Sequence, residues 1–228
     1  MARSILKGAD PSSWDLLVAG GMLGVSSFYW VHNSRWLTGL RDGLEAIHAM
    51  EKSYQKDPRR VDALLGIGLY DYWRSHFTRR LRFLPFFPDR RRQGRGELMR
   101  VMKEGSFASV LAEMALTFID FEEKRYPTVI ESTDRLLKRY PRSTILRMLQ
   151  GQAFLALKKY PETVKAFESI LSIDPAVTKS YLFIGIATAR EGKDPKKARE
   201  SLEKFLSLEP QAPHAWRKPA LEKLHQLK

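Results

Sequence analysis

Side chains that commonly do catalysis or bind metals are sparse in this sequence, and their spacing assembles no reactive site. No cysteine is present, which excludes thiol nucleophiles, zinc–cysteine sites and disulfides. Close acid pairs such as Glu122 and Glu123 are typical of solvated helix faces. None of the histidines forms a His-x-x-x-His or Glu-x-x-His pair suited to a metal ion. The five are His32, His48, His76, His214 and His225. We therefore expect no catalytic residue, no metal, no cofactor and no enzyme activity.

Nucleotide-binding and acyl-transfer motifs are also missing. The sequence contains no GxSxG, no phosphate-binding loop and no GxGxxG. The nearest glycine cluster, Gly20-Gly21 with Gly24, lies inside an apolar run that no strand precedes. A dinucleotide fingerprint needs a strand before its glycines, so this cluster does not predict a nucleotide site.

The most distinctive chemistry lies in the segment from Arg74 to Arg95, RSHFTRRLRFLPFFPDRRRQGR. It holds eight arginines, one aspartate and four phenylalanines. The arginines are Arg74, Arg79, Arg80, Arg82, Arg90, Arg91, Arg92 and Arg95. Three functions are open for such a segment. It could bind nucleic acid by pairing phosphates and stacking bases, or lie at an anionic membrane surface. In the favoured third interpretation, Phe83 to Phe87 tuck into the protein while the arginines solvate its rim. Nucleic acid is the least favoured, because no groove-reading motif accompanies the segment.

Positive charge is unevenly distributed along the chain. The net charge of the 228 residues is +13. Residues 59–105 carry twelve basic and five acidic side chains, whereas residues 1–58 carry six of each. A local basic excess attracts nucleic acid, anionic lipid or acidic protein without choosing among them.

The elements that would position these residues are helices with a repeating punctuation. In GQAFLALKKYPETVKAFESILSIDP, Gly151 to Pro175, apolar residues recur at helical spacing, with a turn before Pro161. Gly151 and Gly185 are 34 residues apart, Pro141 and Pro175 are also 34 apart, and Pro210 follows 35 later. A period of about 34 residues is the signature of tetratricopeptide-type helical arrays.

The apolar run from Leu16 to Val31 is expected to be a buried helix of this array. It is shorter than the roughly 20 residues that a membrane span needs. Asp15 and the lack of a small-residue cleavage site disfavour a signal peptide. The location is left open between the cytoplasm and the periplasm, the latter for a chain trimmed of its signal.

By these residues the chain resembles the tetratricopeptide repeat superfamily over about nine-tenths of its length. The resemblance implies an all-α, right-handed superhelical solenoid of antiparallel helix pairs, with about eleven helices in one domain, 1–228. We expect a first pair at 12–58, a pair at 61–105 interrupted by the insertion 74–95, a degenerate repeat at 110–141, well-formed repeats at 144–175 and 178–210, and a capping helix at 212–228. The second helix of the interrupted pair is expected at about Gly94–Glu104.

Small residues are expected where the two helices of a pair pack closely. A side chain larger than hydrogen or methyl would keep the helix axes apart at such a position. These repeat-packing residues are Ala46, Gly68, Gly151, Gly185 and Ala198.

The superfamily resemblance further implies a concave groove lined by the first helix of each repeat, and binding rather than catalysis. The groove positions are Leu65, Leu69, Tyr72, Trp73, Met114, Phe118, Phe121, Met148, Gln152, Leu155, Lys179, Leu182 and Ile186. Such an apolar groove suits an amphipathic or extended hydrophobic protein segment. The alternative is that these side chains pack against one another and leave no open groove.

Two narrower comparisons within the superfamily are informative. The groove that binds C-terminal carboxylates needs Lys and Asn on successive helices, but the single asparagine, Asn33, lies elsewhere. The segment GIGLYDYW, followed by LPFFPDRRRQG, resembles a larger-repeat subfamily that includes proteins peripheral to outer membranes. The expected partner is thus a protein or peptide segment, with an anionic membrane surface as the alternative.

Overall fold

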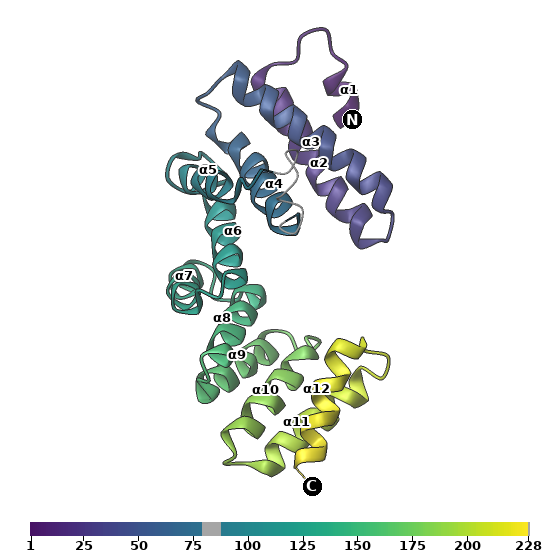
Figure 1. Cartoon of the computed structure of the whole chain (residues 1–228), viewed down its shortest axis with the longest axis vertical. Coiled ribbons are helices and arrows are strands. Elements are labelled where there is room, and N and C mark those ends of the chain that lie inside the picture. Colours follow the sequence, from purple (N-terminus) through teal and green to yellow (C-terminus); the bar gives the residue numbers. More distant parts are fainter. Residues whose placement is uncertain (79–87, 228) are drawn as a thin grey trace. The chain divides into compact units, whose positions relative to one another are not determined.

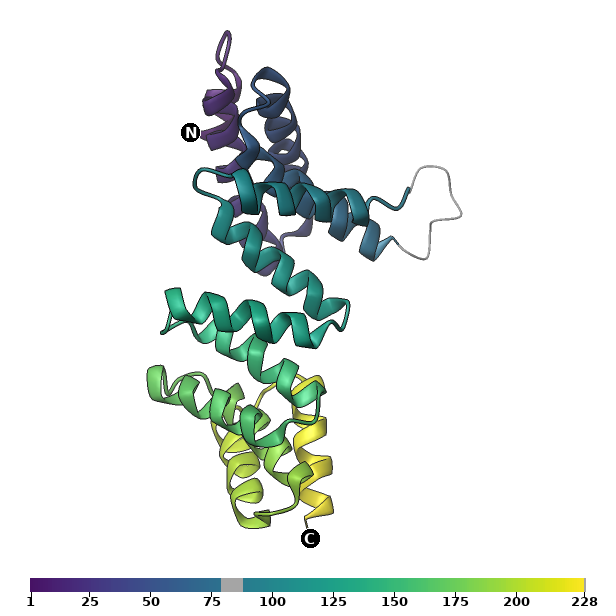
Figure 2. The ribbon, with the colours of Figure 1, turned by 90° about the vertical axis from the view of Figure 1, so that its left-hand side faces the viewer.

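The described residues fold into helices, most of which are joined by short turns (Figures 1 and 2). A computed structural model describes residues 1–78 and 88–227, and within these ranges there is no β-strand. The chain divides into two compact units, Met1–Leu116 and Thr117–Lys228, and the boundary falls inside one helix. The all-α class and the paired helices predicted from the sequence are confirmed. That residues 1–228 form one continuous domain stays a prediction.

The first unit begins with a five-residue helix that precedes the first expected pair at 12–58. Its elements are α1 (Ala2–Leu6), α2 (Ser13–His32), α3 (Trp36–Lys56), the 3₁₀ turn η1 (Val61–Ala63), α4 (Leu64–Phe77), α5 (Arg91–Glu104) and the first part of α6 (Ser109–Glu122). Helix α5 starts at Arg91, three residues before the expected Gly94, because Asp89 hydrogen-bonds the backbone N–H and the guanidinium of Arg91 and so favours an earlier helix start.

The second unit contains the regular repeats. Its helices are the end of α6, α7 (Tyr126–Arg139), α8 (Thr144–Ala156), α9 (Tyr160–Ile173), α10 (Lys179–Glu191), α11 (Pro195–Leu208) and α12 (His214–Gln226). Apolar burial between successive helices supplies the core. Phe167 and Ile170 of α9 pack against Phe183 and Ile184 of α10, and the rings of Phe167 and Phe183 stack with centroids 4.6 Å apart.

The turn inside each helix pair repeats at the predicted period. Lys124, Lys158 and Gly192, each 34 residues from the next, have positive φ angles of 60°, 60° and 78°. After the first two, the next backbone N–H returns to a carbonyl five residues earlier, as in the left-handed termination of many helices. A proline then lies in the first turn of α7, α9 and α11, where its missing N–H leaves no bond unmade. The period therefore reflects a recurring backbone conformation as well as recurring residue types.

The small residues expected between paired helices lie at close contacts. A Cβ at Gly151 would be 2.7 Å from Cε2 of Phe167, and one at Gly185 would be 2.6 Å from Cγ of Leu202. At Gly68 a Cβ would be 2.7 Å from the carbonyl oxygen of Gly94 on α5. Ala46 and Ala198 are buried. Each position thus has no room for a larger side chain without a shift of its neighbour.

Candidate functional site

The first unit carries a cleft between its N-terminal segment and helix α3, which the sequence pattern did not reveal. We call residues 1–11, which include α1, the strap. Its first tie is Arg3, whose guanidinium donates to Asp42 at 2.6 Å and to Glu45 at 2.7 Å. Its second tie is Lys56, which donates to Asp10 and, at 2.9 Å, to the carbonyl oxygen of Pro11. The two ties meet α3 about three helical turns apart, which is about 16 Å along its axis.

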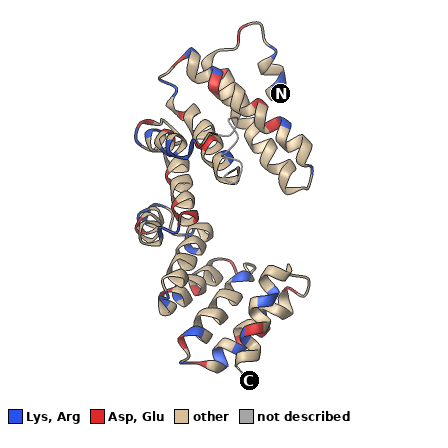
Figure 3. Cartoon of the chain, viewed as in Figure 1, with Lys and Arg blue, Asp and Glu red and all other residues tan. Residues whose placement is uncertain are grey.

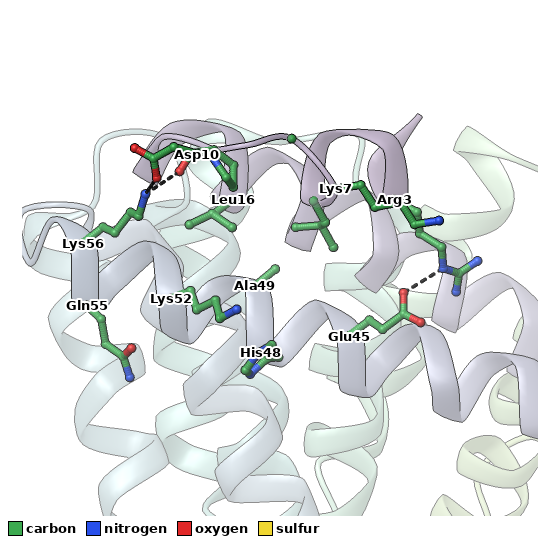
Figure 4. A pocket seen from close by; sticks show the side chains of 13 residues that line it. Arg3, Lys7, Asp10, Leu16, Glu45, His48, Ala49, Lys52, Gln55 and Lys56 are labelled. Atoms are coloured by element: carbon green, nitrogen blue, oxygen red, sulfur yellow. Dashed lines mark hydrogen bonds and ion pairs between the residues drawn. The ribbon is translucent and has the colours of Figure 1, made fainter.

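The strap cleft lies between these two ties (Figure 4). Its volume is about 800 Å³, within the usual range for sites that take small ligands or peptide side chains. Leu6, Leu16 and Ala49 give it apolar surface. Helix α3 lines it with residues three or four apart, and these therefore share one helix face: Glu45, His48, Ala49, Lys52, Gln55 and Lys56.

The charges around the cleft are unbalanced. Both lining carboxylates, Asp10 and Glu45, are paired with the tie residues. In the described part of the chain, the ammonium groups of Lys7 and Lys52 have neither an ion pair nor a hydrogen bond. Two cations without counter-ions thus stand beside apolar surface, an arrangement that suits a ligand with a carboxylate next to an apolar group.

Asp42 holds the first tie in its charged form. Burial alone would raise the pKa of this carboxyl. Hydrogen bonds from Ser26 and Arg3, with the positive charges of Arg3 and Arg41, outweigh burial and hold its pKa below the ordinary value. The tie between Arg3 and Asp42 is therefore an ion pair at neutral pH.

The predicted groove residues are divided among three environments. Tyr72, Leu182 and Ile186 are buried in the core, so they offer no surface to a partner. Phe118 and Lys179 are exposed, and the Lys179 ammonium lies 4.7 Å from the centroid of the Trp216 ring. The partly buried positions are Leu65, Leu69, Trp73, Met114, Phe121, Met148, Gln152 and Leu155.

Helix α12 explains the burial of the last groove positions. Its Ala220 belongs to the core that contains Leu182, Ile186, Leu202 and Phe205, and Trp216 and Leu224 pack against the same core. Leu182 and Ile186 therefore pack within the protein and do not line an open groove. Leu155 joins the same cluster, and Met148 joins the cluster of Phe167.

The arginine-rich insertion is described only at its two ends. Arg79, Arg80 and Arg82, with Phe83, Phe86 and Phe87, lie outside the described residues. At the far end, the Arg90 guanidinium lies 3.6 Å from Asp71 of α4, and the Arg90 N–H donates to Ser75 Oγ at 2.9 Å. Arg91 pairs with Asp89 at 2.8 Å. Arg74 lies over the ring of Tyr70, and Arg92 is exposed. Arg95 is half-buried and makes a contact of its own. Much of the described basic charge thus takes part in structural contacts.

The family of the chain follows from its repeats. A tetratricopeptide repeat model matches residues 130–177, which contain α8, α9 and most of α7. This segment of the chain thus matches a tetratricopeptide repeat, as the sequence pattern predicts. A curated relative is "Small glutamine-rich tetratricopeptide repeat-containing protein 2" of Saccharomyces cerevisiae, 34% identical over 86 residues. The match covers 38% of this chain and only 25% of the length of that relative.

Solved structures of tetratricopeptide repeat proteins share the fold. YrrB, described as a TPR protein with an unusual peptide-binding site, aligns with a TM-score of 0.65 over 97% of each chain at 12% identity. The MamA AMB-1 structure aligns with a TM-score of 0.57, covering 87% of this chain and 96% of MamA at 15% identity. At these identities the likeness concerns the fold alone.

Two further observations concern the described residues. No helix in the ranges 1–78 and 88–227 is both long and apolar enough to cross a membrane. In the same ranges, no group of three or more His, Asp or Glu side chains is placed to hold a metal ion.

Proposed function

We infer that this tetratricopeptide repeat protein is a non-enzymatic scaffold, and that the strap cleft receives a short segment of a partner protein. The observation that carries this proposal is the pair of uncompensated cations, Lys7 and Lys52, beside the apolar surface of Leu6, Leu16 and Ala49. An acidic residue next to a leucine-sized side chain satisfies both features at once.

The lining of the strap cleft is more accessible to a partner than the groove predicted from the sequence. Tyr72, Leu182 and Ile186 would have to leave a packed core before they could touch a partner. The strap cleft needs no such opening, since its lining is already accessible between the two ties. A preformed site binds without the cost of rearranging the free protein. YrrB, which shares the fold of this chain, is described as having an unusual peptide-binding site. That description is consistent with a binding role for a scaffold of this kind.

Affinity selection with a random peptide library on the full chain tests the proposal. We expect enriched peptides to combine an acidic residue with an adjacent large apolar residue. Reversing both charges, Lys7→Glu with Lys52→Glu, should weaken their binding by about tenfold or more, because hydrogen bonds to charged groups contribute about 1.5–3 kcal/mol each.

A charge-matched control separates local recognition from the general positive charge of the protein. Lys138→Glu with Lys204→Glu reverses two exposed lysines in the second unit and should leave the affinity unchanged. Equal weakening by both double variants would show that only the net charge matters. Enrichment of basic or wholly apolar peptides would contradict the cleft as the binding site.

A further inference from the structure

The end of the α2–α3 hairpin exposes large apolar side chains that the rest of its unit leaves uncovered. We define this hairpin end as Val25, Phe28 and Tyr29 of α2 with Trp36, Leu37 and Leu40 of α3. The two sets flank the short turn 33–35. Val25 is 73% exposed, Phe28 75% and Leu37 85%. On each helix the three residues fall within about 100° of arc, so each set forms one stripe.

The packing of the first unit explains why this end stays bare. Helices α2 and α3 meet through small residues, since a Cβ at Gly39 would be 3.0 Å from the Ser27 carbonyl oxygen, and one at Gly20 would be 3.1 Å from that of Ala46. The rest of the unit packs on the other half of α3, where Tyr54 contacts the core of Val61 and Leu64. The strap is likewise tied at Asp42, Glu45 and Lys56, beyond the hairpin end. Among the described residues of this unit, none therefore covers the apolar stripes.

The charges at the hairpin end have one sign. The sequence from residue 16 to residue 41 contains no aspartate or glutamate but includes Arg35 and Arg41, both exposed. Arg35 lies over the ring of Trp30, 4.7 Å from its centroid. The nearest acid, Asp42, is buried and bound by Arg3, although the Arg41 guanidinium also lies 3.4 Å from it. In Figure 3 the end of the hairpin is accordingly almost free of charge, with blue at its turn.

This composition matches the boundary of a bilayer better than a protein surface. Exposed apolar clusters of this kind mark interaction sites. Tyr and Trp favour the headgroup level, where one edge of the ring is apolar and the other is hydrated. Arginine beside them keeps its stem in the apolar layer and its guanidinium among phosphates. A protruding turn with outward-pointing side chains meets a flat surface readily, whereas peptide segments are bound in grooves.

We propose that the hairpin end, led by Phe28, Tyr29, Trp36 and Leu37, inserts into the headgroup region of an anionic membrane. The contact is interfacial, since no described helix can span a bilayer. Arg35 and Arg41 supply the preference for anionic lipid. This contact is independent of the strap cleft, and its residues are not those of the arginine-rich insertion.

Flotation of the full chain with vesicles tests the proposal. Phosphatidylcholine vesicles with phosphatidylglycerol should bind the protein more tightly than vesicles of phosphatidylcholine alone. Phe28→Ser with Leu37→Ser should weaken binding to the mixed vesicles by about tenfold or more, because each side chain loses its transfer from water to an apolar layer. Arg35→Glu should weaken the preference for phosphatidylglycerol, because it reverses one of the two arginine charges at the hairpin end. Both hairpin-end positions are exposed, so the thermal midpoint should stay unchanged and exclude misfolding as the cause.

A matched control uses exposed apolar residues of the second unit. Ile145→Ser with Leu208→Ser should leave vesicle binding unchanged, although both side chains are also exposed. Three outcomes would overturn the proposal: no vesicle binding by the wild type, equal loss in the hairpin-end and control variants, or a lipid-free dimer of the wild type that Phe28→Ser with Leu37→Ser dissociates. The last outcome would assign the hairpin end to a second copy of the chain. Peptide binding at the strap cleft should persist in every hairpin-end variant, so the two proposals fail separately.

Discussion

At the residue scale, single glycines set how closely paired helices approach. Gly151→Leu should destabilise the protein by about 1–3 kcal/mol, since overpacking a filled site costs that much. The reason is Phe167, whose Cε2 lies 2.7 Å from the position of a Cβ at residue 151. Chemical denaturation measured by circular dichroism would give the change in unfolding free energy.

The control for this substitution is Gly96 on α5. A Cβ there would meet nothing within 4 Å, so Gly96→Leu should be neutral or should stabilise by up to about 1 kcal/mol through helix propensity. An unchanged stability for Gly151→Leu would contradict the packing register on which the repeat assignment rests.

Asp71 of α4 gives the stability a dependence on pH. Burial raises the pKa of this carboxyl, and the charges of Arg90 and Arg74 only partly oppose the effect. A raised folded-state pKa means that the folded protein holds the proton more tightly than the unfolded chain does. Stability should therefore fall as pH rises from the ordinary value of about 4 through the folded pKa. The substitution Asp71→Asn removes the contribution of this carboxyl to the pH dependence of stability.

Thermal melts of wild type and Asp71→Asn between about pH 4 and pH 7 would check the sign. The thermal midpoint of the variant should rise relative to that of the wild type as the pH rises. Glu97, whose pKa is raised by burial and also by the charge of Asp71, titrates in both proteins. Loss of the Asp71 charge lowers the folded pKa of Glu97 in the variant, so this change has the same sign as the one expected from Asp71 itself. A gain that grows toward low pH instead would mean that the ion pair with Arg90 outweighs burial.

At the element scale, α12 closes the core of the last repeat. Trp216 packs against two clusters of the second unit, and its ring meets that of Phe183 edge-on at 6.0 Å. Trp216→Ala should cost about 1–3 kcal/mol, because this partly buried ring loses its packing against both clusters when it is removed. The control is Trp36→Ala, which removes an exposed ring at the hairpin end. Calorimetry should find almost no change in its unfolding free energy. Similar losses in both variants would contradict the covering role of α12.

The regular helix pairs could be predicted from sequence because their signals are local. Gly151, Pro161 and Pro175 mark a packing contact, a helix start and a helix stop, and each acts within a few residues. The start of α5 was predicted three residues late, since the side-chain bonds between Asp89 and Arg91 have no signature in apolar periodicity.

The strap cleft could not be predicted in the same way. Its two ties join residues 39 to 46 positions apart in sequence, such as Arg3 to Asp42 and Lys56 to Asp10. A helix face with Glu45, His48 and Lys52 looks like a solvated face until the strap covers it. The run from Leu16 to Val31 likewise indicated a buried helix, yet Val25, Phe28 and Tyr29 are exposed. Apolar residues predict a helix here, but tertiary packing decides which of its faces is covered.

At the scale of the whole molecule, a net charge of +13 draws any acidic partner toward the protein. Affinity for an acidic peptide therefore does not locate its site, and a measurement of position is needed. The strap cleft and the groove predicted from the sequence differ in the residues that a bound segment would touch. Gln55 lines the cleft, whereas Gln152 belongs to the predicted groove.

Photo-cross-linking of a selected acidic peptide to the full chain makes this distinction directly. A benzophenone amino acid would replace Gln55 in one protein and Gln152 in another, and mass spectrometry would measure the cross-linked fraction. The cleft proposal predicts cross-linking from position 55, its loss in the Lys7→Glu, Lys52→Glu background, and little from position 152. Cross-linking from position 152 and none from position 55 would contradict the proposal and assign binding to the groove.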